Sequence, residues 1–256
     1  MRIFDIFKKK KTVENLNLEE LLEHAANQPA HLAAFYKQLL SENVLVIDQN
    51  SDIGNGPQIL KEDSLVRFAA FPDGTIPIFT SVERIFDEGI MNKEISYMRI
   101  KGKDLFEIAD GATFVLNPYS NFSKELIPVE IKKLLTGEIF SNIHSTFVIE
   151  QETAVQISQP ENFPTEIISS LKILFANKKN VNAAYLGWIF NPADNEPAHY
   201  IIGIDAYGDF QDVINEAGFT IKQFLSRNEF IDFIKIDKNE KLGIYFLTKT
   251  QPFYKK

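Results

Sequence analysis

The sequence contains no cysteine among its 256 residues. This absence excludes disulfide bonds, thiolate metal sites and every mechanism that uses a cysteine nucleophile. It fits a reducing compartment, and we therefore expect a cytoplasmic protein.

Long apolar runs and positive charge are also scarce. No run of about 18 apolar residues occurs, so the sequence predicts no transmembrane segment, and the N-terminus shows no apolar region of a signal peptide. The formal net charge is -8. A nucleic-acid partner is not expected, because contact with a phosphate backbone demands a basic surface.

Phenylalanine is abundant, with 22 residues against a single tryptophan. Hydrophobic residues make up 45% of the chain and charged residues 24%, which is typical of a globular protein with a sizeable core. We expect aromatic packing to dominate that core.

The first 14 residues form an N-terminal tail with an unusual composition. Phe4 and Phe7 precede a basic block, Lys8, Lys9, Lys10 and Lys11. Two interpretations stay open: a flexible tail, or an amphipathic element that touches anionic lipid. Liposome pelleting of the chain with and without residues 1–12 separates them.

Helices and strands alternate irregularly along the first half. Two consecutive amphipathic helices are expected within 15–43, with Asn17 and Glu20 forming a capping box of the first and Pro29 in the first turn of the second. Strand patterns follow, and a Pro-Asp-Gly turn joins two of them into a hairpin. The expected strands are 43–48, 64–71, 75–80, 94–100 and 112–118, and two further helices are expected at 103–110 and 128–137.

The second half predicts the order strand–helix–strand–strand–helix–strand–strand. This order is compatible with a ferredoxin-like (split βαβ) layout with an added strand. The fold class is therefore α+β, with two mixed α/β domains at 15–142 and 143–256 and largely antiparallel sheets. The expected elements are 145–158, 164–180, 181–190, 198–208 and 210–228, followed by a hairpin of 230–237 and 241–249.

Two adjacent hydroxyls, Thr80 and Ser81, end the apolar run "IPIF". A serine nucleophile at a strand-to-helix turn needs the pattern G-x-S-x-G, and the flanking residues here are Phe79 and Val82. The stretch instead matches a capping box, with Thr80 as N-cap and Glu83 three residues later. We expect these hydroxyls to begin a helix.

No other pattern in the sequence points to a reaction. The four histidines show neither H-x-x-x-H nor H-E-x-x-H spacing, and phosphate-binding glycine loops do not occur. We therefore expect neither a metal nor a cofactor, and we assign no catalytic residue.

The segment "VLNPYS" combines a buried strand with a turn. Asn117 and Ser120 bond their own backbone in such turns, and Pro118 fixes the bend. The segment is a structural turn or the polar rim of a binding surface. In the second case the surface would comprise Phe79, Thr80, Ser81, Asn117, Pro118 and Ser120.

The order of these segments resembles that of the SseB family, the "enhanced serine sensitivity" proteins. The similar segments are "NLEELLEHAANQPAHLAAFYKQLL", "IPIFTSVERI", "VLNPYS", "VEIKKLL", "YIIGID" and the final "PFY". The resemblance covers roughly residues 15–135 and 145–256, as an SseB N-terminal and an SseB C-terminal domain.

The resemblance implies an intracellular protein linked to serine sensitivity, with no established catalytic residues to carry across. Members have been labelled rhodanese-like, but that sulfur transfer needs a cysteine persulfide, which this chain cannot form. We expect a non-enzymatic binding or regulatory protein whose partner is another protein. The alternatives are an enzyme that acts on an amino-acid-related small molecule and a membrane-surface adaptor using the N-terminal segment.

Overall fold

The computed structural model describes residues 15–49, 56–58, 67–90, 95–140, 155–192, 197–226 and 229–256, with the backbone alone for 56–58. The N-terminal segment that contains Phe4, Phe7 and Lys8 to Lys11 lies outside these ranges. The chain divides into two compact units, Met1–Ile139 and Phe140–Lys256. In the described ranges, no helix is both long and apolar enough to cross a membrane.

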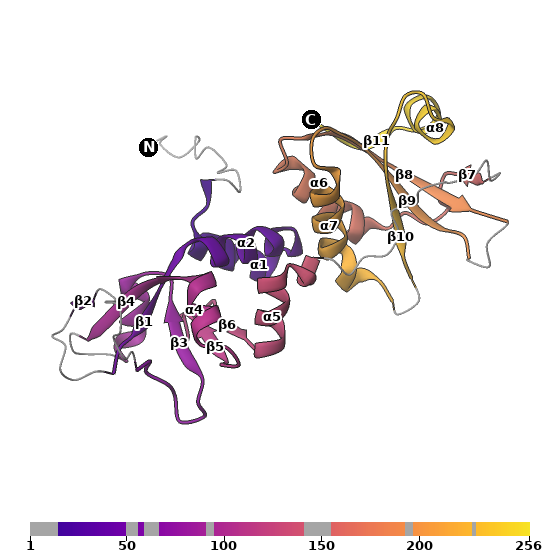
Figure 1. Cartoon of the computed structure of the whole chain (residues 1–256). Helices are drawn as coiled ribbons and strands as arrows, with labels where there is room; N and C mark the ends of the chain where they lie inside the picture. Colours follow the sequence, from indigo (N-terminus) through magenta and orange to yellow (C-terminus); the bar gives the residue numbers. More distant parts are fainter. Residues whose placement is uncertain are drawn as a thin grey trace, which may run out of the picture. The chain divides into compact units, whose positions relative to one another are not determined.

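The first unit is built on a six-stranded mixed sheet in the order β2-β4-β1-β3-β5-β6 (Figure 1). The pairs β1–β4, β1–β3 and β5–β6 are antiparallel, and β2–β4 and β3–β5 are parallel. The strands are β1 (Asn43–Ile47), β2 (Gly56–Gln58), β3 (Ile76–Phe79), β4 (Ser96–Lys101), β5 (Phe114–Leu116) and β6 (Lys124–Leu126).

In the described residues of this unit, five α-helices and three short 3-10 helices lie among these strands. The expected capping box begins α1, because the Glu20 N–H donates to Asn17 Oδ1 at 2.8 Å and the Asn17 N–H donates to Glu20 Oε2 at 3.0 Å. The elements are α1 (Leu18–Asn27), η2 (Pro29–His31), α2 (Leu32–Ser41), α3 (Val82–Ile85), η3 (Asp87–Gly89), α4 (Gly102–Ile108), α5 (Pro128–Thr136) and η4 (Glu138–Phe140).

The central strand β1 is buried on both faces. Side chains alternate along a strand, so Val44 and Val46 face one side while Leu45 and Ile47 face the other. The second side forms a cluster with Phe79 at the end of β3 and Ile85 of α3. This cluster fixes the end of β3, which carries Thr80.

The second unit has a five-stranded sheet in the order β10-β9-β8-β11, and β7 also pairs with β8. The strands β7 and β11 pair with different parts of β8, and only β9–β10 is a parallel pair among these strands. The strands are β7 (Gln156–Ser158), β8 (Val181–Phe190), β9 (His199–Ala206), β10 (Ile231–Lys235) and β11 (Pro252–Lys255).

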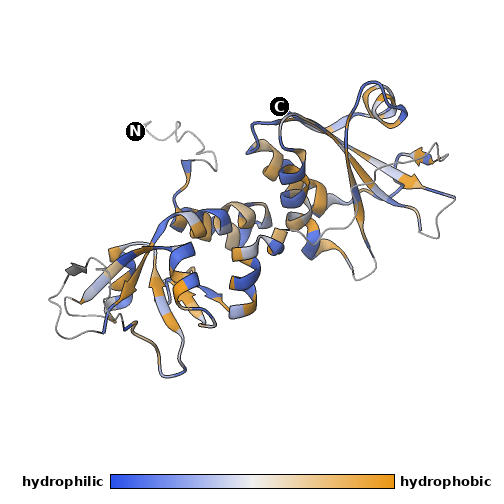
Figure 2. Ribbon diagram, viewed as in Figure 1, coloured by the Kyte–Doolittle hydropathy of each residue, from blue (hydrophilic) through white to orange (hydrophobic). Residues whose placement is uncertain are grey.

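Helices cover both faces of this sheet. The helices α6 (Thr165–Ala176) and α7 (Phe210–Ile221) lie on one side, followed by η5 (Lys222–Phe224), and α8 (Lys241–Lys249) lies on the other (Figure 1). Figure 2 shows hydrophilic and hydrophobic residues mixed on these helices, as amphipathic packing requires.

The prediction of a strand at 241–249 was wrong, because this segment is helix α8. Its apolar residues fit both the helical and the strand repeat. The helical spacing brings Leu242 and Phe246 to one buried face. The Phe246 ring packs against β8 and β9 where Gly187 and Gly203 leave room, since a Cβ on Gly203 would lie 2.8 Å from Phe246 Cδ2. Tertiary packing therefore decided between helix and strand.

The α+β class with mostly antiparallel strands is confirmed. The expected split βαβ connection differs from the one found. A split unit places another strand between the two that a helix joins, whereas β9 and β10, joined through α7, are direct parallel neighbours. Because 241–249 is helical, β10 has no hairpin partner from that segment.

The predicted strand 64–71 is represented in the described residues by one bridge, from Phe68 to Asp48. The following turn forms as expected, since the Gly74 N–H donates to the Phe71 carbonyl at 2.9 Å. Strand β6 (Lys124–Leu126) was not predicted, because three residues give too short an alternation to recognise.

A close approach between α2 and α4 provides a stability test. A Cβ on Gly102 would lie 1.9 Å from the Leu39 carbonyl oxygen, which is a backbone atom. We expect Gly102→Ala to lower the free energy of unfolding by about 1–3 kcal/mol in denaturant titrations. Lys103→Ala, exposed on the same helix, is the control and should change it by less than about 0.5 kcal/mol. Equal stability of both variants would contradict the packing.

Candidate binding sites

Asn117 directly follows β5 and lies in the left-handed region, with φ 49°. Its side chain is buried, with 1% exposed. The Asn117 N–H donates to the Ile78 carbonyl at 2.8 Å, and its carbonyl accepts from the Ser120 N–H at 3.0 Å. Asparagine tolerates this conformation better than most residues, so the turn is specified by the residue itself.

The Asn117 carboxamide binds both polar groups of Thr80. Its Oδ1 accepts from the Thr80 N–H at 2.9 Å, and its Nδ2 donates to Thr80 Oγ1 at 3.0 Å. The hydroxyl has one proton, which donates to Glu19 Oε2 at 3.2 Å. This assignment gives each of the three side chains at least one hydrogen-bond partner. We call this set, Glu19, Thr80 and Asn117, the Asn117 network.

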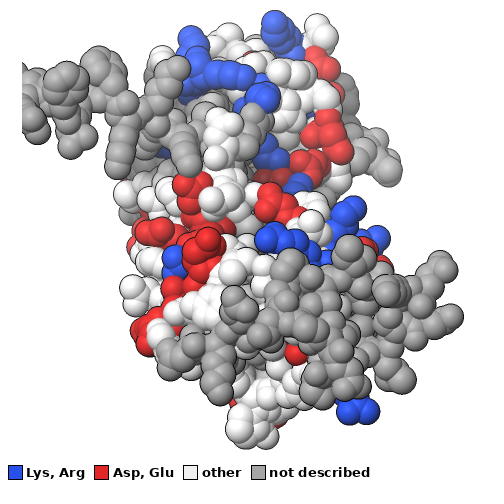
Figure 3. Space-filling model, turned by 90° about the vertical axis from the view of Figure 1, so that its left-hand side faces the viewer, with Lys and Arg blue, Asp and Glu red and all other residues white. Residues whose placement is uncertain are grey.

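Arg84 extends the Asn117 network toward solvent. Its Nε lies 3.0 Å from Glu19 Oε1, and its Nη1 donates to Asp87 Oδ2 at 2.7 Å. The network therefore connects the first turn of α1, the ends of β3 and β5, and α3. Beside it lies a cavity of about 210 Å3 lined by Glu19, Leu22, Glu23, Arg84, Asn117, Ser120, Asn121 and Phe122. Figure 3 shows clusters of acidic and of basic side chains interspersed on one face of the molecule.

The six residues of the predicted surface occupy different depths. Phe79 is fully buried and Asn117 is buried, so these two support the surface from beneath. The other four, Thr80, Ser81, Pro118 and Ser120, are half-buried. The Ser120 hydroxyl donates to the Phe122 carbonyl at 2.8 Å, which shapes the turn after Pro118.

The predicted N-cap was one residue too early. Helix α3 begins with Ser81 as N-cap, without a side-chain hydrogen bond to the helix backbone. Thr80 does not cap, because its hydroxyl is used in the Asn117 network. The Glu83 carboxylate instead accepts from its own backbone N–H and from the Ser81 hydroxyl, and both bonds lower the pKa of Glu83.

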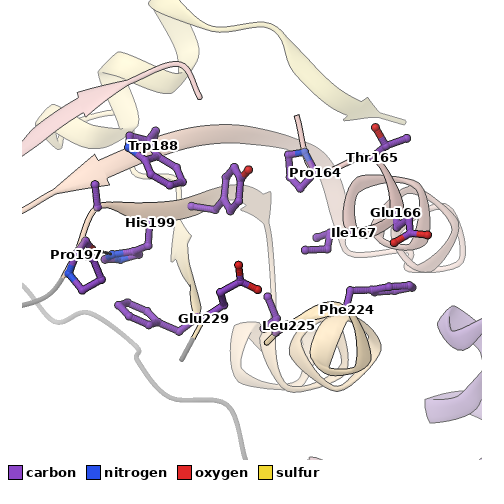
Figure 4. A pocket seen from close by; sticks show the side chains of 13 residues that line it. Pro164, Thr165, Glu166, Ile167, Trp188, Pro197, His199, Phe224, Leu225 and Glu229 are labelled. Atoms are coloured by element: carbon purple, nitrogen blue, oxygen red, sulfur yellow. Dashed lines mark hydrogen bonds between the residues drawn. The ribbon is translucent and has the colours of Figure 1, made fainter. Parts of the chain in front are cut away.

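A larger cavity, of about 400 Å3, lies in the second unit and was not predicted. Figure 4 shows side chains from the start of α6, from β8 and β9 and from the segment after α7 converging on it. We call this the aromatic cavity. Its lining is Pro164, Thr165, Glu166, Ile167, Trp188, Pro197, Ala198, His199, Tyr200, Phe224, Leu225, Glu229 and Phe230.

His199 forms one wall of the aromatic cavity through two hydrogen bonds. Its Nδ1 lies 2.9 Å from the Pro197 carbonyl, which can only accept, so Nδ1 donates. Its Nε2 lies 2.9 Å from Oδ2 of Asp232, a residue with 1% exposed. Both ring nitrogens are therefore engaged. In the described part of the chain, no group of three or more His, Cys, Asp or Glu side chains is arranged to hold a metal.

Comparison with known proteins assigns both units. The family model of the SseB protein N-terminal domain matches residues 18–133, and that of the SseB protein C-terminal domain matches residues 149–256. Protein SseB of Escherichia coli strain K12 is 32% identical over 243 residues, which cover 93% of this chain and 92% of that protein. The chain belongs to the SseB family. Protein SseB of Shigella flexneri matches equally well, and no solved structure matches the chain.

The SseB matches include both candidate sites. The N-terminal SseB domain contains the whole Asn117 network, and the C-terminal SseB domain contains the aromatic cavity. The sequence offered one signal for the cavity that was missed. His199 begins one strand and Asp232 lies near the start of another, and these residues meet only if the two strands are parallel neighbours. The expected split βαβ layout would have separated them.

We expect Asn117→Ala to lower the free energy of unfolding of this SseB-family chain by about 2–4 kcal/mol, because it leaves the Thr80 N–H and hydroxyl without their buried partner. Asn117→Gly should cost about 1 kcal/mol less, since glycine relieves the left-handed backbone. Denaturant unfolding measures both, with Asn121→Ala as an exposed neighbouring control. Identical losses in the Ala and Gly variants would show that the backbone carries no strain.

Proposed function

We propose that this chain is a non-enzymatic, cytoplasmic binding protein that recognises another protein through the surface over the Asn117 network. The supporting observation is that Thr80 and His199, the candidate catalytic side chains of the two described sites, are bonded to neighbouring groups of the fold. In these positions the two side chains shape the surfaces of the two units.

Thr80 is the first such group. A nucleophilic hydroxyl needs a base that takes its proton and an open path to the substrate. The Thr80 hydroxyl instead donates to Glu19, accepts from Asn117 and lies in a half-buried position. Glu19 also forms an ion pair with Arg84, whose Nε lies 3.0 Å from Glu19 Oε1, and this contact restricts its orientation.

His199 is the second group, and it weighs against the alternative of an enzyme. In a catalytic triad the carboxylate holds one imidazole nitrogen and the other nitrogen serves the substrate. Here the Pro197 carbonyl occupies that second nitrogen. The Tyr200 hydroxyl of the same cavity donates to the Asn162 carbonyl at 2.9 Å. These contacts fit a rigid binding cavity better than a proton-transfer site.

The surface over the Asn117 network contains both hydrogen-bond donors and hydrogen-bond acceptors. Glu19 and Glu23 accept, while Arg84 and the Asn121 amide donate. Among the charged residues that line the cavity, Glu19 and Glu23 outnumber Arg84, so the lining is net negative. This charge is complementary to a polar protein segment that carries lysine or arginine.

Charge reversal at the rim tests the proposal. Glu23→Arg and Asn121→Arg change exposed positions and leave the Asn117 network intact. We expect each to weaken binding of the captured partner at least tenfold, measured by titration calorimetry with the purified partner after a pull-down from lysate. The matched control is Glu107→Arg, exposed on α4 outside the cavity lining, which should bind as the parent does. If the partner binds the parent and the three variants with the same Kd, this surface is not its binding site.

A further inference from the structure

The aromatic cavity combines ring faces with carboxylates, and the proposed protein-binding surface does not include it. Trp188 and Tyr200 meet edge to face, with ring centroids 4.8 Å apart and planes at 79°. His199 and Phe230 lie 4.2 Å apart. The rings come from β8, from β9 and from the residue before β10, so secondary structure fixes their positions. Phe224 closes the side next to α6 (Figure 4).

The two aromatic residues of the edge-to-face pair also border a second hollow. It has a volume of about 380 Å3 and is lined by Ser158, Gln159, Pro160, Glu161 and Asn162 together with Trp188 and Tyr200. Tyr200 lines both hollows, and its hydroxyl donates a hydrogen bond to the carbonyl of Asn162, which lines the second one. The Trp188–Tyr200 pair therefore stands between two recesses, and both contain an acidic residue.

The charge of the lining is negative. Glu166 and Glu229 line the aromatic cavity and Glu161 lines the adjoining hollow, while no Lys or Arg occurs among the described residues of either lining. Glu166 lies in the first turn of α6, where it offsets the positive end of the helix dipole. Glu229 remains as a carboxylate without such a role, and Figure 4 shows it pointing into the cavity.

His199 adds no net positive charge to this balance. Its Nδ1 proton is held by the Pro197 carbonyl, and one further proton lies between Nε2 and the Asp232 carboxyl. An imidazolium beside a carboxylate and a neutral imidazole beside a carboxylic acid both sum to zero. The backbone N–H of Ser226 donates to Glu229 Oε2 at 2.8 Å and lowers the pKa of Glu229, so that carboxyl is ionised at neutral pH.

We propose that the aromatic cavity binds a small organic cation, an ammonium or methylated ammonium group on a short apolar chain. Aromatic faces attract such cations through their quadrupoles, and a nearby carboxylate adds direct charge attraction. The volume of about 400 Å3 lies in the range of small-molecule sites. Ile167, Leu225 and Pro164 supply apolar walls for the chain of the ligand.

Trp188 makes the proposal directly measurable, because it is the single tryptophan in the chain and lines the cavity. The probe is choline, and its matched control is 3,3-dimethylbutan-1-ol, which has the same shape without the charge. We expect choline to change the Trp188 emission with a saturable dependence, and the neutral alcohol to need about tenfold higher concentration. The anion 3,3-dimethylbutanoate should bind more weakly than the alcohol.

A variant separates charge recognition from shape. Glu229→Gln keeps an acceptor for the Ser226 N–H and removes the charge. It should weaken choline binding several-fold and leave the response to the neutral alcohol unchanged, while Glu240→Gln, exposed at the start of α8, should match the parent. The proposal is overturned by equal affinities for choline and the alcohol, by tighter binding of the anion, or by a choline titration without saturation. None of these outcomes depends on the protein partner of the first unit.

Discussion

The buried carboxamide of Asn117 is the interaction on which the first unit's candidate site depends. It binds the backbone N–H and the hydroxyl of Thr80 at the same time, and Asn117 occupies a left-handed conformation at the end of β5. A buried amide is costly unless all of its groups are bonded, so the geometry of this junction is fixed within narrow limits. Glu19 and Arg84 then continue the network toward the surface, where the proposed partner would contact them.

In the second unit, strand pairing rather than a buried carboxamide positions the candidate site. Parallel pairing of β9 and β10 brings the start of both strands to one edge, and the buried Asp232 holds His199 there. Aromatic residues of β8 and β9 complete the wall. In both units a buried polar group positions the surface above it, and we propose these two surfaces as binding sites. This division is consistent with binding functions on two folded SseB domains.

Local chemistry predicted many elements of the fold, and non-local pairing limited the rest. The capping box at Asn17 and Glu20 and the helix end at Gly137 depend on neighbouring residues, and both are present. The helix at 241–249 could not be recognised from the sequence, because its apolar residues fit a helix and a strand equally well. The space that Gly187 and Gly203 leave on β8 and β9 favours the helix. The aromatic cavity was missed for a related reason, since it requires the β9–β10 neighbour relation. At Thr80 the sequence favoured a local cap, whereas its actual partner, Asn117, lies 37 residues away.

The most direct test of a structural rather than a chemical role for Thr80 is the unfolding free energy of Thr80→Val, which keeps the shape and removes the hydroxyl. A loss of about 1–3 kcal/mol is predicted, because Asn117 Nδ2 loses its acceptor and Glu19 loses a donor. A catalytic hydroxyl held for reactivity usually adds nothing to stability and can even reduce it. Unchanged or increased stability of Thr80→Val would therefore contradict the account.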